Sequence, residues 1–132
     1  MNERPAPDSP EAWLQRARSD LAIARAVLDS PDVLREDVCF HAQQCAEKAL
    51  KALLIHLEIL YQRTHALETL IDLLKASGVE VPQGVDRSFS LSQYAVETRY
   101  PGEWEPITEE ETRSALEMAA TVLAWVKEQL GE

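Results

Sequence analysis

Cysteine and glycine are scarce in this sequence, and no apolar run is long enough to cross a bilayer. Only two cysteines and four glycines occur among 132 residues, and no glycine-rich phosphate loop or nucleophile-elbow sequence is present. The longest apolar run is interrupted by His56 and Glu58, which argues against a membrane span. The N-terminal sequence MNERPAPDSP is polar and lacks the apolar core of a signal peptide, so we expect a cytoplasmic protein.

The two cysteines, Cys39 and Cys45, fall on one expected helix. With about 100° of rotation per residue, their side chains point roughly 120° apart and cannot form a disulfide within that helix. We therefore expect buried, reduced thiols. His41 and Cys45 have the spacing of metal ligands on a helix, but two ligands are too few and no second pair accompanies them. The sequence predicts no metal site and no cofactor.

Acidic residues outnumber basic residues, and the net charge of −10 argues against broad nonspecific binding to nucleic acid. The charge is unevenly distributed along the chain. Residues 38–65 contain three basic and two acidic residues together with all three histidines, whereas residues 97–132 contain nine acidic and three basic residues. Two interpretations are open: a local anion site on the central helix, or an acidic surface that only aids solubility.

The stretch from Val38 to Tyr61 has no glycine or proline and has apolar residues at helical spacing. It predicts a long helix that begins near Val33 or Asp37 and ends at Tyr61. One face consists mainly of small residues, which allow a neighbouring helix to approach closely: Ala42, Cys45, Ala46, Ala49, Leu53 and Leu57. A second stripe at the same spacing is polar and comprises His41, Gln44, Lys48 and Lys51.

Turn and capping residues divide the rest of the chain into further helices. Ser9 or Asp8 caps a first helix, Thr64 a third, Asp86 a fourth, and Thr108 with Glu111 forms a capping box for the last. Ser77-Gly78 ends the third helix, and a loop follows. These signals predict helices at residues 11–30, 65–76 and 87–100 and a last one after residue 108, with the loop at residues 79–85.

No alternating strand pattern, internal repeat or second domain is evident. Leucine and alanine recur at heptad steps in the first and last helices, and the connections are short. The sequence thus predicts an all-α fold, an antiparallel up-and-down bundle of four main helices plus one short helix. Residues 1–9 are expected to be a disordered leader, and residues 10–132 the bundle domain.

Two polar features are candidates for a binding site. The stripe of His41, Gln44, Lys48 and Lys51 offers hydrogen-bond donors for a phosphate group; the alternative is that the lysines are solvated, with Glu47 available for local pairing. Arg99-Tyr100 precedes a helix-breaking Pro-Gly pair. This arginine either reaches an anionic ligand at the mouth of the bundle or simply interacts with the dipole at a helix C-terminus.

The sequence HAQQCAEKALKALLIHLEI, followed by Thr64-His65-x-Leu67 and later by ETRYPG, resembles the HEPN-domain family. The resemblance covers about residues 11–130 and implies a bundle of four to five helices that is often a homodimer. Small prokaryotic members are often encoded beside a minimal nucleotidyltransferase (MNT), in a two-component system of toxin–antitoxin type. Many relatives are metal-independent ribonucleases, whose motif is Arg, four to six residues, then His, acting across a dimer cleft.

This chain departs from the ribonuclease motif that the resemblance implies. After Arg99, the positions that should provide the histidine hold Trp104, Glu105 and Pro106, so the general acid/base of RNA cleavage has no obvious occupant. The leading interpretation is a non-catalytic, homodimeric HEPN protein that binds a nucleotide, an RNA phosphate or a partner nucleotidyltransferase. A divergent ribonuclease and a pure protein-interaction module are the alternatives. The candidate ligand-binding residues are Arg99, Lys48, Gln44 and His41, with Tyr100 and His65 as second choices.

Overall fold

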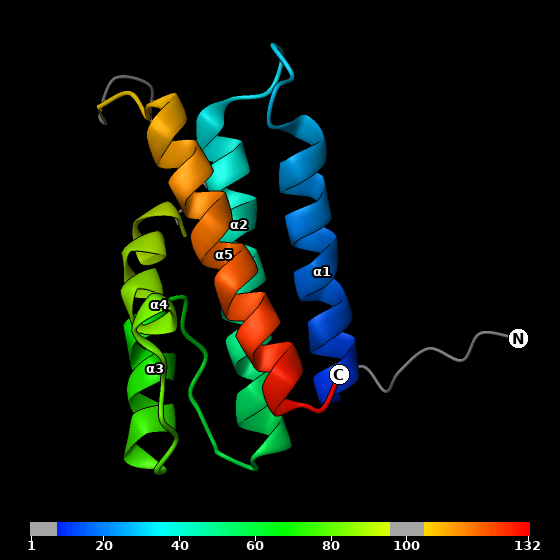
Figure 1. Ribbon diagram of the computed structural model, residues 1–132, viewed down its shortest axis with the longest axis vertical. Coiled ribbons are helices and arrows are strands. Elements are labelled where there is room, and N and C mark those ends of the chain that lie inside the picture. Colours follow the sequence, from blue (N-terminus) through cyan, green and yellow to red (C-terminus); the bar gives the residue numbers. More distant parts are fainter. Residues whose placement is uncertain (1–7, 96–104) are drawn as a thin grey trace, which may run out of the picture.

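A computed structural model describes residues 8–95 and 105–132 of the chain. These residues form helices and no strand, and the helices pack into a bundle, which confirms the all-α prediction (Figure 1). Arg99 and Tyr100 lie outside the described residues. The helices are α1 (Pro10–Val27), α2 (Arg35–His56), α3 (Leu67–Ala76), α4 (Gln83–Asp86), the 3-10 helix η1 (Arg87–Tyr94) and α5 (Glu109–Gln129).

Helix α2 lies at the centre of the bundle and contacts α1, α5, α3 and η1 (Figure 1). The predicted face of small residues is buried from Ala42 to Leu53, which allows this close packing. Helices α2 and α5 approach closely: Cys45 Sγ of α2 lies 3.9 Å from the carbonyl oxygen of Ala119 on α5. Both cysteines are free and buried, as expected.

The central helix ends at His56, earlier than the predicted end at Tyr61. Glu58 adopts a left-handed conformation (φ 59°), and the backbone N–H of Ile59 donates to the carbonyl of Leu54 while that of Glu58 donates to the carbonyl of Ile55. This is the Schellman arrangement, which usually has glycine at the left-handed position. Because glutamate occupies that position here, no stop signal is visible in the sequence. Leu57, predicted to be part of the packing face, is exposed.

The connection after α2 turns back along that helix before α3 begins (Figure 1). Helix α3 starts at Leu67, later than the predicted start at His65, and Thr64 is not its N-cap. The Thr64 hydroxyl instead accepts from the N–H of Ala66 within the connection. The first N–H of α3, that of Leu67, donates to Ser92 Oγ of η1 over 2.9 Å. A partner from a distant segment thus takes the place of the expected local cap.

Local capping signals located the other helix ends more closely. Ser9 caps α1 by accepting from the N–H of Ala12, and Thr108 caps α5 by accepting from the N–H of Glu111. Gly78 ends α3 in a left-handed conformation, as predicted. Helix α1 was expected to extend to Ser30 but ends at Val27.

The region between α3 and α5 differs most from the prediction. Residues 83–86 form the short helix α4 inside a segment that was expected to be a loop up to residue 85. Asp86 caps no helix with its side chain and instead pairs with Lys75 of α3. The fourth predicted helix is a 3-10 helix over residues 87–94, where Ser88 and Ser90 bond backbone carbonyls three residues earlier. Such local bonds compete with the regular α-helical pattern.

Candidate functional site

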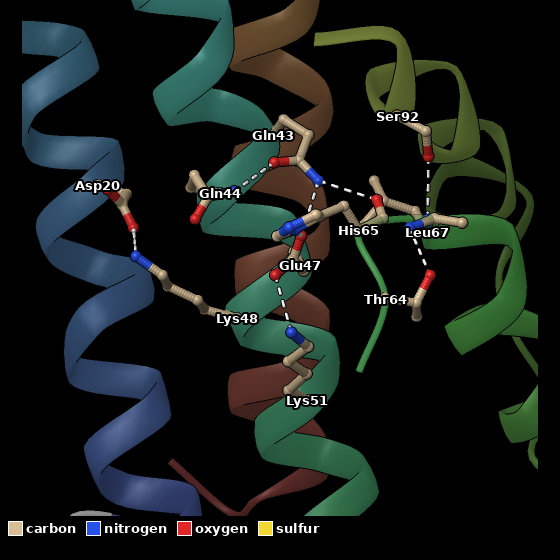
Figure 2. A network of polar contacts seen from close by, with 11 residues as sticks. Asp20, Gln43, Gln44, Glu47, Lys48, Lys51, Thr64, His65, Leu67 and Ser92 are labelled. Carbon is tan, nitrogen blue, oxygen red and sulfur yellow. Dashed lines mark hydrogen bonds and ion pairs between the residues drawn. The ribbon is translucent and has the colours of Figure 1, made fainter. Parts of the chain in front are cut away.

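The polar residues of α2 divide into two clusters, one facing α1 and one facing the connection that leads to α3 (Figure 2). Each cluster is built around one carboxylate. Glu47 of α2 is the centre of the cluster on the α3 side, and Asp20 of α1 is the centre of the cluster on the α1 side. Three members of the predicted stripe are bonded to these carboxylates: Lys51 to Glu47, and His41 and Lys48 to Asp20.

Glu47 accepts three hydrogen bonds from side chains. Its Oε2 lies 2.8 Å from Lys51 Nζ, and its Oε1 lies 2.8 Å from His65 Nδ1 and 3.0 Å from Gln43 Nε2. Gln43 Nε2 also donates to the backbone carbonyl of His65 over 3.2 Å. Two side chains one turn apart on α2 therefore hold both the main chain and the imidazole of His65 (Figure 2).

The Glu47–Lys51 pair is removed from water. The side chains of Glu47 and Lys51 are 4% and 7% exposed. Burial raises the pKa of the Glu47 carboxyl, but the hydrogen bonds from Lys51, Gln43 and His65, with the charge of Lys51, outweigh it and leave the pKa below its ordinary value. The Lys51 ammonium also lies 5.5 Å from the ring centroid of Trp13 and 5.9 Å from that of Tyr61, which adds cation–π attraction.

Asp20 bridges His41 and Lys48 in the other cluster. Its Oδ1 lies 2.9 Å from His41 Nδ1 and its Oδ2 lies 2.7 Å from Lys48 Nζ. The Asp20 side chain is only 9% exposed, whereas those of His41 and Lys48 are 30% and 22% exposed. This cluster is therefore closed toward α1 and partly open toward solvent.

The structure brings the predicted stripe residues together only in part. His41 and Lys48 share Asp20, and Gln44 Nε2 donates to Gln43 Oε1 over 2.7 Å. Lys51 was expected either to bind a phosphate or to be solvated, with Glu47 available for pairing. Lys51 does pair with Glu47, but both side chains are buried inside the protein. His65 is 62% exposed although it bonds Glu47. The predicted Arg99 and Tyr100 fall outside the described part of the chain.

Sequence reasoning missed the importance of Asp20, Gln43 and Glu47. Asp20 occurs among the apolar heptad positions of α1, next to Leu21, where an acidic residue is unusual. Gln43, Glu47 and Lys51 are spaced at steps of four, which places them on one helix face. Both signals were present, but only the tertiary contacts distinguish a buried network from an exposed row.

The described residues contain a hollow of about 440 Å³ at the start of α5. Tyr94, Thr108, Glu110, Glu111 and Met118 contribute to its lining, and none of the α2 cations does. Within residues 8–95 and 105–132, no group of three histidine, cysteine or acidic residues is placed to hold a metal ion. None of the helices described combines the length and the apolar character that a membrane crossing demands.

Comparison with known families identifies the chain. The HEPN domain family matches residues 10–129. The chain belongs to the HEPN family. The "Putative toxin MJ1304" of Methanocaldococcus jannaschii is similar to this HEPN protein, with 30% identity over 134 residues that cover 91% of this chain and 87% of that protein.

Three solved structures are similar to this chain in fold. The protein TT1696 of Thermus thermophilus is 32% identical, with a TM-score of 0.74 and coverage of 92% of this chain and 98% of that one. ST0689, described as an archaeal HEPN homologue, is 30% identical, with a TM-score of 0.72 and coverage of 92% and 97%. A HEPN domain protein of Thermotoga maritima is 19% identical, with a TM-score of 0.71 and coverage of 91% and 98%, and supports the fold alone.

Replacing Glu47 with glutamine tests the buried cluster of this HEPN protein. Because Glu47→Gln leaves the Lys51 ammonium buried without a counter-charge, we expect the free energy of unfolding to fall by about 3–5 kcal/mol. Urea denaturation measures this loss. Glu109→Gln is the matched control, since Glu109 also pairs with a cation four residues later but on the surface, and it should cost no more than about 0.5 kcal/mol. Equal losses in the two variants would contradict the assignment.

The lowered pKa of Glu47 also predicts how stability depends on pH. A carboxyl whose native pKa lies below its unfolded value stabilises the protein fully above that unfolded value, here about 4.5, and loses this contribution as the pH falls through the native pKa. The difference in unfolding free energy between the wild type and Glu47→Gln should therefore shrink as the pH falls below about 4.5. Urea titrations at several values between pH 6 and pH 3 measure it; a constant difference is the opposing result.

Proposed function

We propose that this HEPN protein is one component of a toxin–antitoxin-like pair and that it acts by binding a nucleotide or a partner nucleotidyltransferase. The similarity to a protein named as a putative toxin over 91% of this chain supports the two-component role. The nucleotidyltransferase partner and the nucleotide ligand are proposed because the resemblance to small HEPN proteins implies them.

Binding without RNA cleavage is favoured by the arrangement of the histidines. No histidine follows Arg99 at the spacing of the ribonuclease motif. His41 and His65 precede it, and each directs Nδ1 to a carboxylate, Asp20 and Glu47 respectively. A general acid/base must reach the ribose or the leaving oxygen, and no imidazole in this chain has the motif's relation to Arg99. A divergent ribonuclease is the alternative activity.

The observation that carries the binding proposal is the partly open Asp20 cluster. In a chain of net charge −10, His41 and Lys48 are two cationic or potentially cationic groups held side by side by one carboxylate. Lys48 supplies a charge, and His41 and Gln44 supply hydrogen bonds to a phosphate. Arg99 would add a bidentate contact and Tyr100 a stacking surface, with His65 as a further contact. The homodimer is part of the same proposal and is what the resemblance to the family implies.

Calorimetric titration of the purified protein with ATP, GTP and a short RNA tests the binding proposal. Since a bidentate arginine contact to phosphate is charge-assisted, Arg99→Ala should weaken binding about tenfold or more. Arg113→Ala is the control, because Arg113 pairs with Glu109 on the surface of α5 and should not change the affinity.

Two further assays separate the alternatives on the same samples. Co-expression with a minimal nucleotidyltransferase of the type found beside small HEPN proteins should give a stable complex by light scattering, and an RNA cleavage assay should show no activity above background. Absence of both nucleotide binding and the complex would contradict the proposal. RNA cleavage that Arg99→Ala abolishes would replace it with the ribonuclease alternative.

A further inference from the structure

The connection between α2 and α3, residues 57–66, lies along α2 and is called the strap below. None of its residues is buried, although Ile59 and Tyr61 pack against the core with part of their surface. Leu60 is 93% exposed and Leu57 is 41% exposed. The strap therefore buries little apolar surface of its own, and such burial is the largest contribution that holds a segment in place.

Few hydrogen bonds connect the main chain of the strap to the rest of the bundle. Residues 57–59 bond to the last turns of α2, and the N–H of Ala66 donates to Thr64 Oγ1 within the strap. Between residues 60 and 65, the described part of the chain shows one main-chain hydrogen bond, which the carbonyl of His65 accepts from Gln43 Nε2 over 3.2 Å. A segment with so few main-chain bonds can open without unfolding its neighbours.

The polar contacts that hold the strap all come from one face of α2. His65 Nδ1 lies 2.8 Å from Glu47 Oε1, and the ring centroid of Tyr61 lies 5.9 Å from the Lys51 ammonium. Together with Gln43, these two residues of α2 are spaced at steps of four along the helix. Figure 2 shows His65 directed to this row. The strap is thus fastened to α2 by polar contacts at two positions, His65 and Tyr61.

Beneath these contacts lies an ion pair. The side chains of Glu47 and Lys51 are 4% and 7% exposed, and Trp13 of α1 also lies within 5.5 Å of the Lys51 ammonium. Opening the strap returns water to two charged groups, whereas opening a cover over an apolar surface exposes that surface to water. The regained hydration offsets part of the contacts that are lost, so this cover opens more easily than an apolar one.

The first end of the strap contains a strained residue. Glu58 has a φ of 59°, a left-handed conformation in which the Cβ atom lies too close to a carbonyl oxygen. The hydrogen bonds of Glu58 and Ile59 to the last turns of α2 maintain it. Release of the strap lets Glu58 return to an ordinary conformation, which favours opening. At the other end, the bond from the N–H of Leu67 to Ser92 Oγ marks where the packed bundle resumes.

We propose that the strap opens locally, between Glu58 and Leu67, while the helices stay packed, and that its opening exposes Lys51 to solvent. Lys51 lies one turn after Lys48 on α2, so opening places a second ammonium within reach of a molecule at the α2 surface. The strap thereby controls access to the Lys51 end of the polar stripe. This motion does not depend on the identity of any ligand.

Trace acetylation of lysine amines with sulfo-N-hydroxysuccinimide acetate, read by mass spectrometry, measures the opening. The rate at Lys51 in the folded protein is divided by its rate in the protein unfolded in urea. Alkylation of the fully buried Cys45 reports unfolding of the bundle in the same way. We expect Lys51 to react at least about tenfold faster than this unfolding allows. Low urea should hardly change the Lys51 rate, because local opening exposes little surface.

Two substitutions should move the opening in opposite directions. His65→Ala removes a hydrogen bond to the Glu47 carboxylate, so the Lys51 rate should rise about tenfold. Glu58→Gly removes the left-handed penalty from the closed strap, so the rate should fall about threefold. Gln62→Ala is the matched control, because Gln62 is an exposed strap residue outside these contacts and its replacement should leave the rate unchanged.

Circular dichroism of each variant reports whether the bundle is folded. If His65→Ala fails to fold, Glu58→Gly still tests the proposal, because this substitution is expected to stabilise the closed strap. A Lys51 rate that follows the Cys45 rate at every urea concentration shows that only unfolding exposes Lys51 and overturns the local opening. A rate that neither His65→Ala nor Glu58→Gly changes overturns it as well. Both results leave the proposed nucleotide and partner binding standing.

Discussion

The carboxylate of Glu47 constrains this bundle more than any other polar group described. It is buried in the middle of α2, where an unpaired charge is strongly unfavourable, and it meets Lys51, Gln43 and His65 at hydrogen-bond distance. Because His65 belongs to the connection after α2, these bonds place that connection along the helix. The start of α3, and the Leu67–Ser92 contact that joins α3 to η1, depend on this placement.

A second carboxylate has a different consequence, although its chemistry is the same. Asp20 also pairs with two side chains, His41 and Lys48, and both are partly exposed to solvent. Lys51, in contrast, is enclosed by Trp13 and Tyr61. The stripe that looks uniform in the sequence is therefore divided by burial: Lys51 is buried, whereas His41 and Lys48 are partly exposed. The partly exposed part is the one for which we propose an anionic ligand.

The sequence predicted those features of the fold that depend on neighbouring residues. The caps at Ser9, Thr108 and Gly78 use side chains or conformations within one turn of the helix end. The end of α2 was missed because Glu58 adopts a left-handed conformation that is unusual for glutamate. The start of α3 and the burial of Lys51 depend on Ser92 and Trp13, which are distant in sequence. The site residues His41 and Lys48 could be proposed from helical spacing, but Asp20, which joins them, could not.

The central claim is that the Glu47–Lys51 pair contributes to stability as a unit inside the bundle. A double-mutant cycle with Glu47→Gln, Lys51→Met and the double variant measures this most directly, by urea denaturation at pH 7. We expect each single variant to be destabilised and the double variant to lose less than the two losses added, with a coupling energy of about 2 kcal/mol or more. Losses that add to within about 0.5 kcal/mol would show that the two side chains act independently and would contradict a role for the pair as a unit.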